Sequence, residues 1–282
     1  MSSHQTTTAT TRHQHSPTIA LKPVTSPSDI PHLAAINEHA LDSDPLKQWM
    51  ARYTSSTEYD TTVVALTSAL RDSNYRVVKA VVPDASTGSD DGEKIVGFVH
   101  WMCGYIYLEG GYGSAQRNCK KDVEGVGGSG QGVGDVKDPA SDVAEVLAEE
   151  SARLGQGSGG QKDQDDEARA RRLKRGEAKY IDTRNHYIGA IRGKKHMFVR
   201  RLMVLPEFQG RGIGRKLMKV VTDDADRQKI VCWLFARPAG AKMYESFGFK
   251  VVSVTEMDEP EDGFTCPAGK GMMRSPQPVV ID

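Results

Sequence analysis

The chain has 282 residues, of which 38% are hydrophobic and 26% are charged, so it can form one large or two small domains but cannot be packed core throughout. Its 37 lysines and arginines balance its 37 aspartates and glutamates, which argues against a nucleic-acid binder and against a protein held at an anionic membrane surface. The four cysteines are widely spaced and no apolar run reaches the ~18 residues of a membrane span, which favours a soluble protein in a reducing compartment, the cytoplasm or alternatively the nucleus.

Residues 1–17 are predicted to be a disordered tail, because they are mostly Ser, Thr, Gln and His and offer almost nothing to bury. His13 and His15 could hold a metal ion, but no carboxylate or cysteine accompanies them, so no metal site is predicted. Since the chain also lacks a broad basic field, the partner expected from composition is a small molecule.

The first elements expected are a strand followed by two helices. Residues 18–22 contain a short apolar run, and Ser28 and Asp29 then offer capping oxygens to a helix whose apolar residues are Ile30, Leu33, Ile36 and Leu41. Ser55 and Glu58 have capping-box spacing ahead of a second helix, whose apolar face is formed by Val63, Leu66 and Leu70.

A β-hairpin and a long insertion are expected next. Residues 75–82 and 95–102 are rich in β-branched and aromatic residues, and the stretch between them has turn chemistry. Residues 104–195 are glycine-rich and highly charged, which predicts a flexible insertion with at most exposed helices. The basic cluster at 169–175 is either a patch for nuclear import or an anionic partner, or a solvated helix face balanced by nearby carboxylates.

The strongest pattern follows the strand expected at 196–204. Gln209, Gly210, Gly212 and Gly214 form a Gln-x-x-Gly-x-Gly turn ahead of a helix. Such a turn is an anion cradle, because glycines let backbone N–H groups converge and the helix N-terminus adds about half a positive charge. The spacing matches neither the dinucleotide fingerprint G-x-G-x-x-G nor the nucleotide-triphosphate loop G-x-x-x-x-G-K-[ST].

A second pattern lies downstream of the cradle. Residues 230–236 are an almost wholly apolar run of strand type, residues 238–247 have helical spacing, and Gly248 with Phe249 ends the helix. Tyr244 stands four residues before Gly248. The remaining runs, 250–254 and 271–273, can supply the last strands, and 276–282 is a short tail.

The two patterns together resemble the acyl-CoA signature of the GNAT superfamily of N-acyltransferases. The resemblance covers roughly 18–103 and 196–275, and implies one α/β domain over 18–275 with a mixed, mostly antiparallel sheet flanked by helices. The insertion at 104–195 then lies between the third and fourth strands. The resemblance also implies that the fourth strand parts from its neighbour near its end and bonds the pantetheine arm of acetyl-CoA as if it were another strand.

Several site residues follow from the resemblance. The backbone of Leu202 and Val204, with Met203 between them, is expected to contact the thioester and pantetheine, and a Leu202 N–H to stabilise the oxyanion. Tyr244 is expected to protonate the leaving thiolate, the alternative being a core tyrosine. Arg211 and Arg215 are expected either to add charge at the diphosphate or to lie at a solvated helix start. The full set expected to bind the cofactor is Leu202, Met203, Val204, Gln209, Gly210, Arg211, Gly212, Ile213, Gly214 and Arg215.

The general base has no clear candidate. Relatives that acetylate protein lysines carry a glutamate on the fourth strand, where this chain has Phe198, and this departure favours a small-molecule amine. His196 and Glu109 are alternatives, as are an amine that binds neutral and a water relay. The aromatic segment 101–109 either lines an acceptor pocket or packs under the insertion.

The sequence therefore predicts an enzyme that moves an acetyl group from acetyl-CoA to a primary amine by direct attack in a ternary complex, since no Cys or Ser lies in a nucleophile motif. Two alternatives stay open: a CoA-binding module without catalysis, and an acetyltransferase of protein lysines or N-termini. The acceptor, the acyl chain and the oligomeric state are not predicted.

Overall fold

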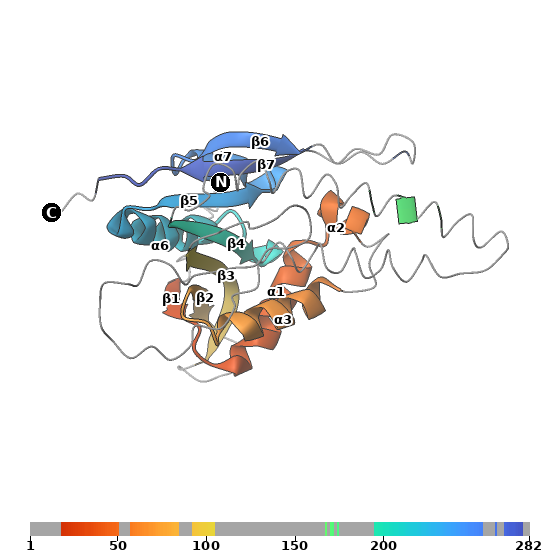
Figure 1. Ribbon diagram of the computed structural model, residues 1–282. Helices are drawn as coiled ribbons and strands as arrows, with labels where there is room; N and C mark the ends of the chain where they lie inside the picture. Colours follow the sequence, from red (N-terminus) through yellow and green to blue (C-terminus); the bar gives the residue numbers. More distant parts are fainter. Residues whose placement is uncertain are drawn as a thin grey trace, which may run out of the picture.

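Seven strands form one mixed sheet in the computed structural model of the chain (Figure 1). The structure describes residues 18–50, 57–84, 92–104, 195–255 and 268–278, together with Glu167, Ala170, Arg171, Lys174 and Gly263. The elements are β1 Ala20–Pro23, η1 Pro27–Asp29, α1 Ile30–Ala40, α2 Pro45–Met50, α3 Glu58–Ala69, β2 Tyr75–Pro83, β3 Glu93–Gly104, β4 His196–Val204, η2 Pro206–Phe208, α6 Ile213–Gln228, β5 Val231–Ala236, α7 Pro238–Glu245, β6 Lys250–Thr255 and β7 Gly269–Arg274.

The strand order is β1-β2-β3-β4-β5-β7-β6, and every neighbouring pair is antiparallel except β4 with β5. This confirms the predicted fold class, including the hairpin of β2 and β3 and the long segment between β3 and β4. Among the described residues, the structure contains no helix with the length and apolar character needed to span a bilayer.

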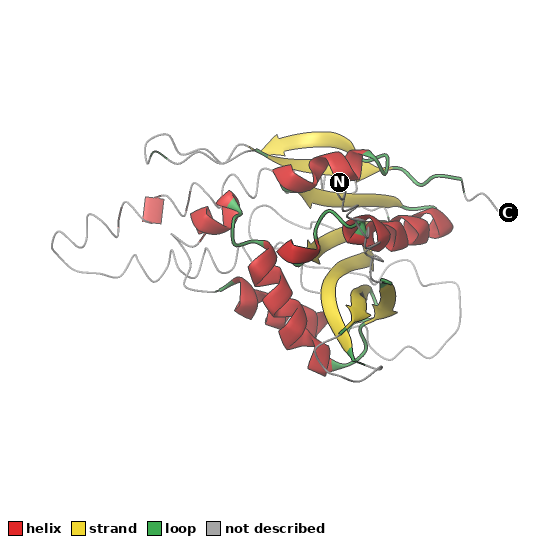
Figure 2. Cartoon of the chain, turned by 180° about the vertical axis from the view of Figure 1, so that it is seen from behind, coloured by secondary structure: helices red, strands yellow, loops and turns green. Residues whose placement is uncertain are grey.

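Helices cover both faces of the sheet, and each face has its own core. On one face, α1 and α3 lie side by side (Figure 2) and pack on residues of β2 and β3. On the other face, α6 and α7 pack on alternate residues of β3, β4 and β5. Because successive side chains of a strand point to opposite faces, β3 serves both cores, with Phe98 and Met102 on the first face and Val99 and Trp101 on the second.

Asp29 is the N-cap residue of α1, as predicted, but without a side-chain capping contact, whereas the predicted cap of α3 was wrong in its residue. Asp29 makes no side-chain cap for α1, because its carboxylate binds Lys79 Nζ on β2 at 2.7 Å. The helix α3 is capped by Thr57, whose Oγ1 accepts a hydrogen bond from Asp60 N at 3.0 Å, two residues after the position predicted from Ser55. Both helices nevertheless form where apolar periodicity placed them, because tertiary packing and not the cap dominates helix stability.

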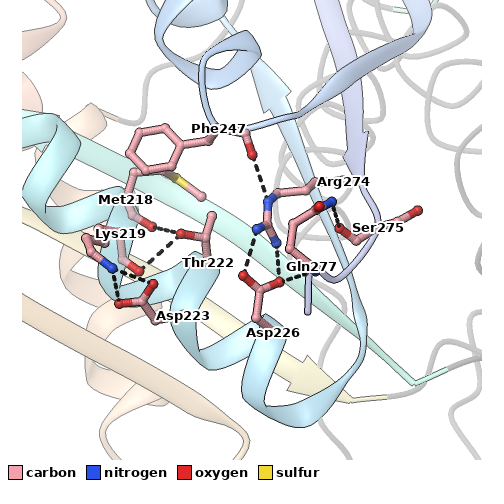
Figure 3. Close-up of polar contacts among 9 residues, drawn as sticks. All are labelled: Met218, Lys219, Thr222, Asp223, Asp226, Phe247, Arg274, Ser275 and Gln277. Atoms are coloured by element: carbon pink, nitrogen blue, oxygen red, sulfur yellow. Dashed lines mark hydrogen bonds and ion pairs between the residues drawn. The ribbon is translucent and has the colours of Figure 1, made fainter. Parts of the chain in front are cut away.

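A buried ion pair fastens β7 to α6 (Figure 3). Arg274 Nη1 and Nη2 donate to the two carboxylate oxygens of Asp226 at 2.6 and 2.7 Å, and Arg274 Nε donates to Phe247 O at 2.8 Å. Gln277 N donates to the same carboxylate at 2.6 Å. Burial pulls the pKa of Asp226 upward, but the hydrogen bonds from Arg274 and Gln277 outweigh it and lower the pKa below its ordinary value.

Several predictions fall on residues outside the described ranges. They are the tail 1–17 with His13 and His15, most of the insertion 104–195 including Glu109, and the end of the tail 276–282. Of the basic cluster, the structure describes a helical Arg171 whose guanidinium pairs with Glu167 at 2.7 Å, with both side chains more than 60% exposed. That contact is typical of a solvated helix face.

Candidate functional site

The strands β4 and β5 part in the middle of the sheet. Their parallel pairing runs from His196 opposite Val231 to Val199 opposite Leu234 and ends there, whereas β4 continues to Val204 and β5 to Ala236. The last residues of the two strands therefore form the two walls of an opening. A parted pair of strands leaves backbone groups that can bond an extended ligand as an additional strand would.

The hydrogen-bonding alternation of β4 decides which backbone groups face this opening. Leu205 N donates to Val96 O at 2.9 Å, and Val204 lies opposite Gly97 in the antiparallel register with β3. Because hydrogen-bonded and non-hydrogen-bonded pairs alternate along an antiparallel ladder, Met203 bonds toward β3 while Leu202 and Val204 direct their N–H and C=O groups toward the opening. The roles of Leu202 and Val204 toward a cofactor stay predictions, and the side chain of Gln209 already donates to Val204 O. Met203 has only its side chain to offer.

A β-bulge precedes the opening. The register of β3 and β4 shifts between His100 opposite Arg201 and Trp101 opposite Val199, so Arg200 is the extra residue. A bulge bends its strand and increases the local twist. It lies one residue past Val199, the last residue of β4 paired with β5, and so accounts for the departure of β4 from β5.

The glycine cradle begins directly beyond β4. Gly210 and Gly212 have φ values of +72° and +79°, which side-chain-bearing residues rarely adopt, and no atom lies within 4 Å of a Cβ built on either. Gly212 is the N-cap of the 16-residue helix α6. The amides of Ile213, Gly214 and Arg215 occupy its first turn, where a helix has no carbonyl of its own to pair with them. The cradle is thus an open, positively polarised backbone surface.

Side chains of the cradle mainly brace it. Gln209 Nε2 donates to Val204 O at 3.0 Å and closes the turn onto the end of β4. Arg211 Nη2 donates to Glu207 O at 2.9 Å, and its guanidinium lies 5.1 Å from the centre of the Phe208 ring. Arg215 Nη1 donates to Ser246 Oγ at 2.9 Å and so links α6 to the end of α7.

The helix α7 follows β5 along the chain and carries Tyr244. A Cβ built on Gly214 would lie 3.4 Å from Met243 Sδ and 3.6 Å from Leu202 Cδ2, so the start of α6, the end of β4 and α7 converge. The Tyr244 ring meets Phe249 edge-on with ring centres 6.0 Å apart. Burial raises the pKa of Tyr244 to about 12, which keeps its phenol protonated at neutral pH and able to donate a proton.

None of the candidates for a general base gains direct support. Phe198 packs against Trp233, with ring centres 4.7 Å apart. His196 is fully buried at the start of β4, six residues before Leu202, which corresponds to about 20 Å along a strand. The aromatic segment beyond β3 lies largely outside the described residues, and Trp101 itself is part of the core under α6. The identity of the general base therefore stays a prediction.

One buried histidine was missed in the sequence analysis. His100 is completely buried on β3, 5.4 Å from the Tyr75 ring centre, and neither of its ring nitrogens has a hydrogen-bond partner in the structure as described. Burial first, and then the nearby charges of Arg200 and Arg201, hold the pKa of His100 well below its ordinary value. A lone histidine inside an apolar strand run was the one available signal. Within the described ranges no cluster of His, Cys, Asp and Glu could hold a metal ion.

Comparison with known proteins assigns the same region to one family. A family model described as an acetyltransferase (GNAT) domain matches residues 176–251, which include β4, α6, β5 and α7. An uncharacterized N-acetyltransferase of Schizosaccharomyces pombe is 31% identical over 84 residues, which make up 30% of this chain and 36% of the relative. The match thus spans about a third of the length of that relative.

Solved structures share the fold at low identity. Arylalkylamine N-acetyltransferase 2 from Aedes aegypti superimposes with a TM-score of 0.54 at 16% identity, over 92% of this chain and 99% of that chain. The mosquito protein named arylalkylamine N-acetyltransferase like 5b gives a TM-score of 0.50 at 14% identity, over 92% of this chain and 100% of that chain. These likenesses concern the fold.

Proposed function

This chain belongs to the GNAT acetyltransferase superfamily, and on that premise we propose that it transfers an acetyl group from acetyl-CoA to a primary amine. One observation carries the proposal. The parting of β4 from β5 after Val199 and Leu234 lies beside the open cradle formed by Gly210 and Gly212. An extended amide-bearing arm ending in a diphosphate needs both features in that order.

The chain would hold acetyl-CoA mainly through its backbone. Leu202 and Val204 direct backbone groups to the opening where a pantetheine arm would lie, and the first turn of α6 directs amides to the diphosphate. Arg211 and Arg215 already contact Glu207 and Ser246, so we infer that their side chains add less to affinity than the amides do.

The proposed reaction is direct transfer. The neutral amine attacks the thioester carbonyl carbon, the Leu202 N–H donates to the oxygen that becomes negative, and the C–S bond then breaks. Tyr244 gives its proton to the departing thiolate, and the proton released by the attacking nitrogen restores the phenol, directly or through water. A phenol with a pKa of about 12 remains protonated until the thiolate forms.

A small amine is the acceptor we propose. The balanced net charge of the chain and Phe198 in place of a strand carboxylate both disfavour a basic protein tail. Phe198 lies half-buried on β4, beside the buried Trp233 and one residue before the pairing with β5 ends. Flat rings suit the apolar part of an amine, which makes arylalkylamines the first acceptors to test.

Acetyl-CoA titration with a matched pair of variants tests this function. Gly212→Ala and Gly248→Ala each place a methyl group on a residue with positive φ, +79° and +87°, with no atom within 4 Å of the new Cβ. Both should therefore cost about 1–2 kcal/mol of stability. Only Gly212→Ala alters the cradle, and we expect it alone to weaken acetyl-CoA binding by about tenfold or more.

Thiol release with a panel of amines then separates the alternatives. The panel contains tyramine, spermidine, Nα-acetyl-lysine methylamide and a peptide with an N-terminal alanine. Release with tyramine supports the proposal, whereas release with only the lysine or peptide probe shows a protein acetyltransferase. Binding without release from any probe indicates a non-catalytic module, and an absence of acetyl-CoA binding overturns the proposed function.

A further inference from the structure

One ion pair joins parts of the chain that are 193 residues apart in sequence. Asp44 precedes α2 in the connection from α1, and its Oδ1 accepts a hydrogen bond from Lys47 N at 3.1 Å. The same oxygen pairs with Arg237 Nη1. The two side chains are only 14% and 28% exposed, so the contact is sheltered and stronger than a typical surface ion pair.

Arg237 lies at the mouth of the opening. It follows the last residue of β5 and is the N-cap of α7, three residues beyond Leu234, where the pairing with β4 ends. Figure 1 shows α2 set apart from α1 and α3, on the side toward which β4 and β5 point. The ion pair therefore connects the α1–α2 connection to the far wall of the opening, across the end where the strands have separated.

The two faces of the sheet would serve the two substrates separately. The cradle and Tyr244 belong to the face covered by α6 and α7, so acetyl-CoA would occupy the opening from that face. An amine that attacks the thioester then has to approach from the opposite face, which α1 and α3 cover. The α1–α2 connection borders that approach, and it is held there by Asp44 and Arg237.

From this geometry we infer that Asp44 and Arg237 are positioning residues for the acceptor amine. Their ion pair fixes the α1–α2 connection against the β5–α7 junction and thereby completes the acceptor entrance, without contacting acetyl-CoA. The inference rests on the proposed function, because it needs a ternary complex with an amine. Its signature is a rise in KM for the amine while KM for acetyl-CoA stays constant.

The test is a double-mutant cycle. Asp44→Asn keeps a capping oxygen for α2, since Asn caps as well as Asp, but removes the charge. Arg237→Gln removes the other charge. With the panel amine that gives the highest turnover, each single variant should raise the amine KM about tenfold, which equals ~1.4 kcal/mol. The double variant should be no worse than either single variant, because both remove the same contact.

A nearby ion pair provides the control. Asp42 binds Lys47 Nζ at 2.8 Å in the same connection, but its side chain is 66% exposed and does not touch Arg237. Asp42→Asn should leave the amine KM within twofold of the parent protein. An equal rise in Asp42→Asn would mean that any loosening of the connection acts alike, and would overturn the role of the Asp44–Arg237 pair.

The remaining outcomes separate the two proposals. If the parent protein turns over an amine and Asp44→Asn lowers only the melting temperature, the pair is structural and the inference fails while the proposed function stands. Additive effects in the double variant also overturn the inference, because the two residues would then act apart. If the parent protein does not bind acetyl-CoA or acetylates none of the four amines, both proposals fall.

Discussion

The placement of Tyr244 depends on the absence of a side chain at Gly240, one helical turn earlier. A Cβ built on Gly240 would lie 2.9 Å from Tyr244 Cε2, whereas ordinary contact begins at 3.4 Å. Gly240→Ala therefore has to move the tyrosine ring by about half an ångström. Since a displacement of ~1 Å can cost about 10²-fold in rate, we expect kcat to fall about tenfold.

Stability should respond differently from rate. Alanine in place of glycine inside a helix gains about 0.8–1 kcal/mol of helix propensity, which offsets part of the steric cost. The melting temperature should therefore change little, and acetyl-CoA affinity should be unchanged because the cradle is not touched. The assay combines thermal denaturation, acetyl-CoA titration and thiol release. Ala239→Leu, at the neighbouring exposed position, is the matched control and should retain the parent kcat.

The same substitution in the Tyr244→Phe variant tests whether the effect passes through the phenol. Tyr244→Phe should lower kcat with little loss of acetyl-CoA affinity, and Gly240→Ala added to it should cause no further loss. If Gly240→Ala lowers kcat equally in both backgrounds, the new methyl group acts elsewhere than on the phenol. If it leaves kcat within twofold of the parent in the native background, Tyr244 does not need its observed position, and its role as the acid is refuted.

Three further predictions concern charge. Arg274→Ala leaves the Asp226 carboxylate without its bidentate partner and should lower the free energy of unfolding by about 3–5 kcal/mol in urea titrations. Lys219→Ala, in an exposed ion pair, should lower it by less than about 1 kcal/mol. Similar losses in the two variants would contradict the burial of the Asp226–Arg274 pair. Arg215→Gln should weaken acetyl-CoA binding by less than about tenfold, as its guanidinium already has a partner, and a larger loss in the titration would show direct diphosphate contact. The pKa of His100 is depressed in the native chain, so below pH 6.5, about the ordinary pKa of histidine, His100 takes up a proton only in the unfolded chain. The free energy of unfolding should therefore fall by about 1.4 kcal/mol for each pH unit below that value. His100→Phe should abolish this contribution to the slope in denaturation curves between about pH 5 and 7.

Local sequence patterns predicted the elements from β4 to α7 well. Apolar runs and glycines located β4, α6, β5 and α7, because each is bounded by a glycine or proline whose backbone preference is local. The side-chain capping contact predicted for Asp29 does not form, for a different reason. Capping side chains have alternative partners, and Lys79, fifty residues away, outcompetes the backbone for the Asp29 carboxylate.

Long-range contacts had no local signal. Asp44 and Arg237 meet only because the α1–α2 connection and the β5–α7 junction reach the same end of the sheet, and neither residue stands in a motif. The direction of the Leu202 backbone follows from the β3–β4 register, which depends on the bulge at Arg200. Sequence alone does not reveal a one-residue bulge, although the resemblance to a family implied its consequence.

The short pairing between β4 and β5 makes the middle of the sheet a weak junction between its two halves. Four residue pairs are the ladder that joins the half-sheet β1–β4 to the half-sheet β5–β7–β6. The Asp226–Arg274 pair links α6 to β7 and the Asp44–Arg237 pair links the α1–α2 connection to the β5–α7 junction, so both add contacts between the two half-sheets. A ligand bound between β4 and β5 would add further contacts between the two half-sheets. Its binding should therefore slow amide hydrogen exchange in both half-sheets together, far beyond the residues that it touches.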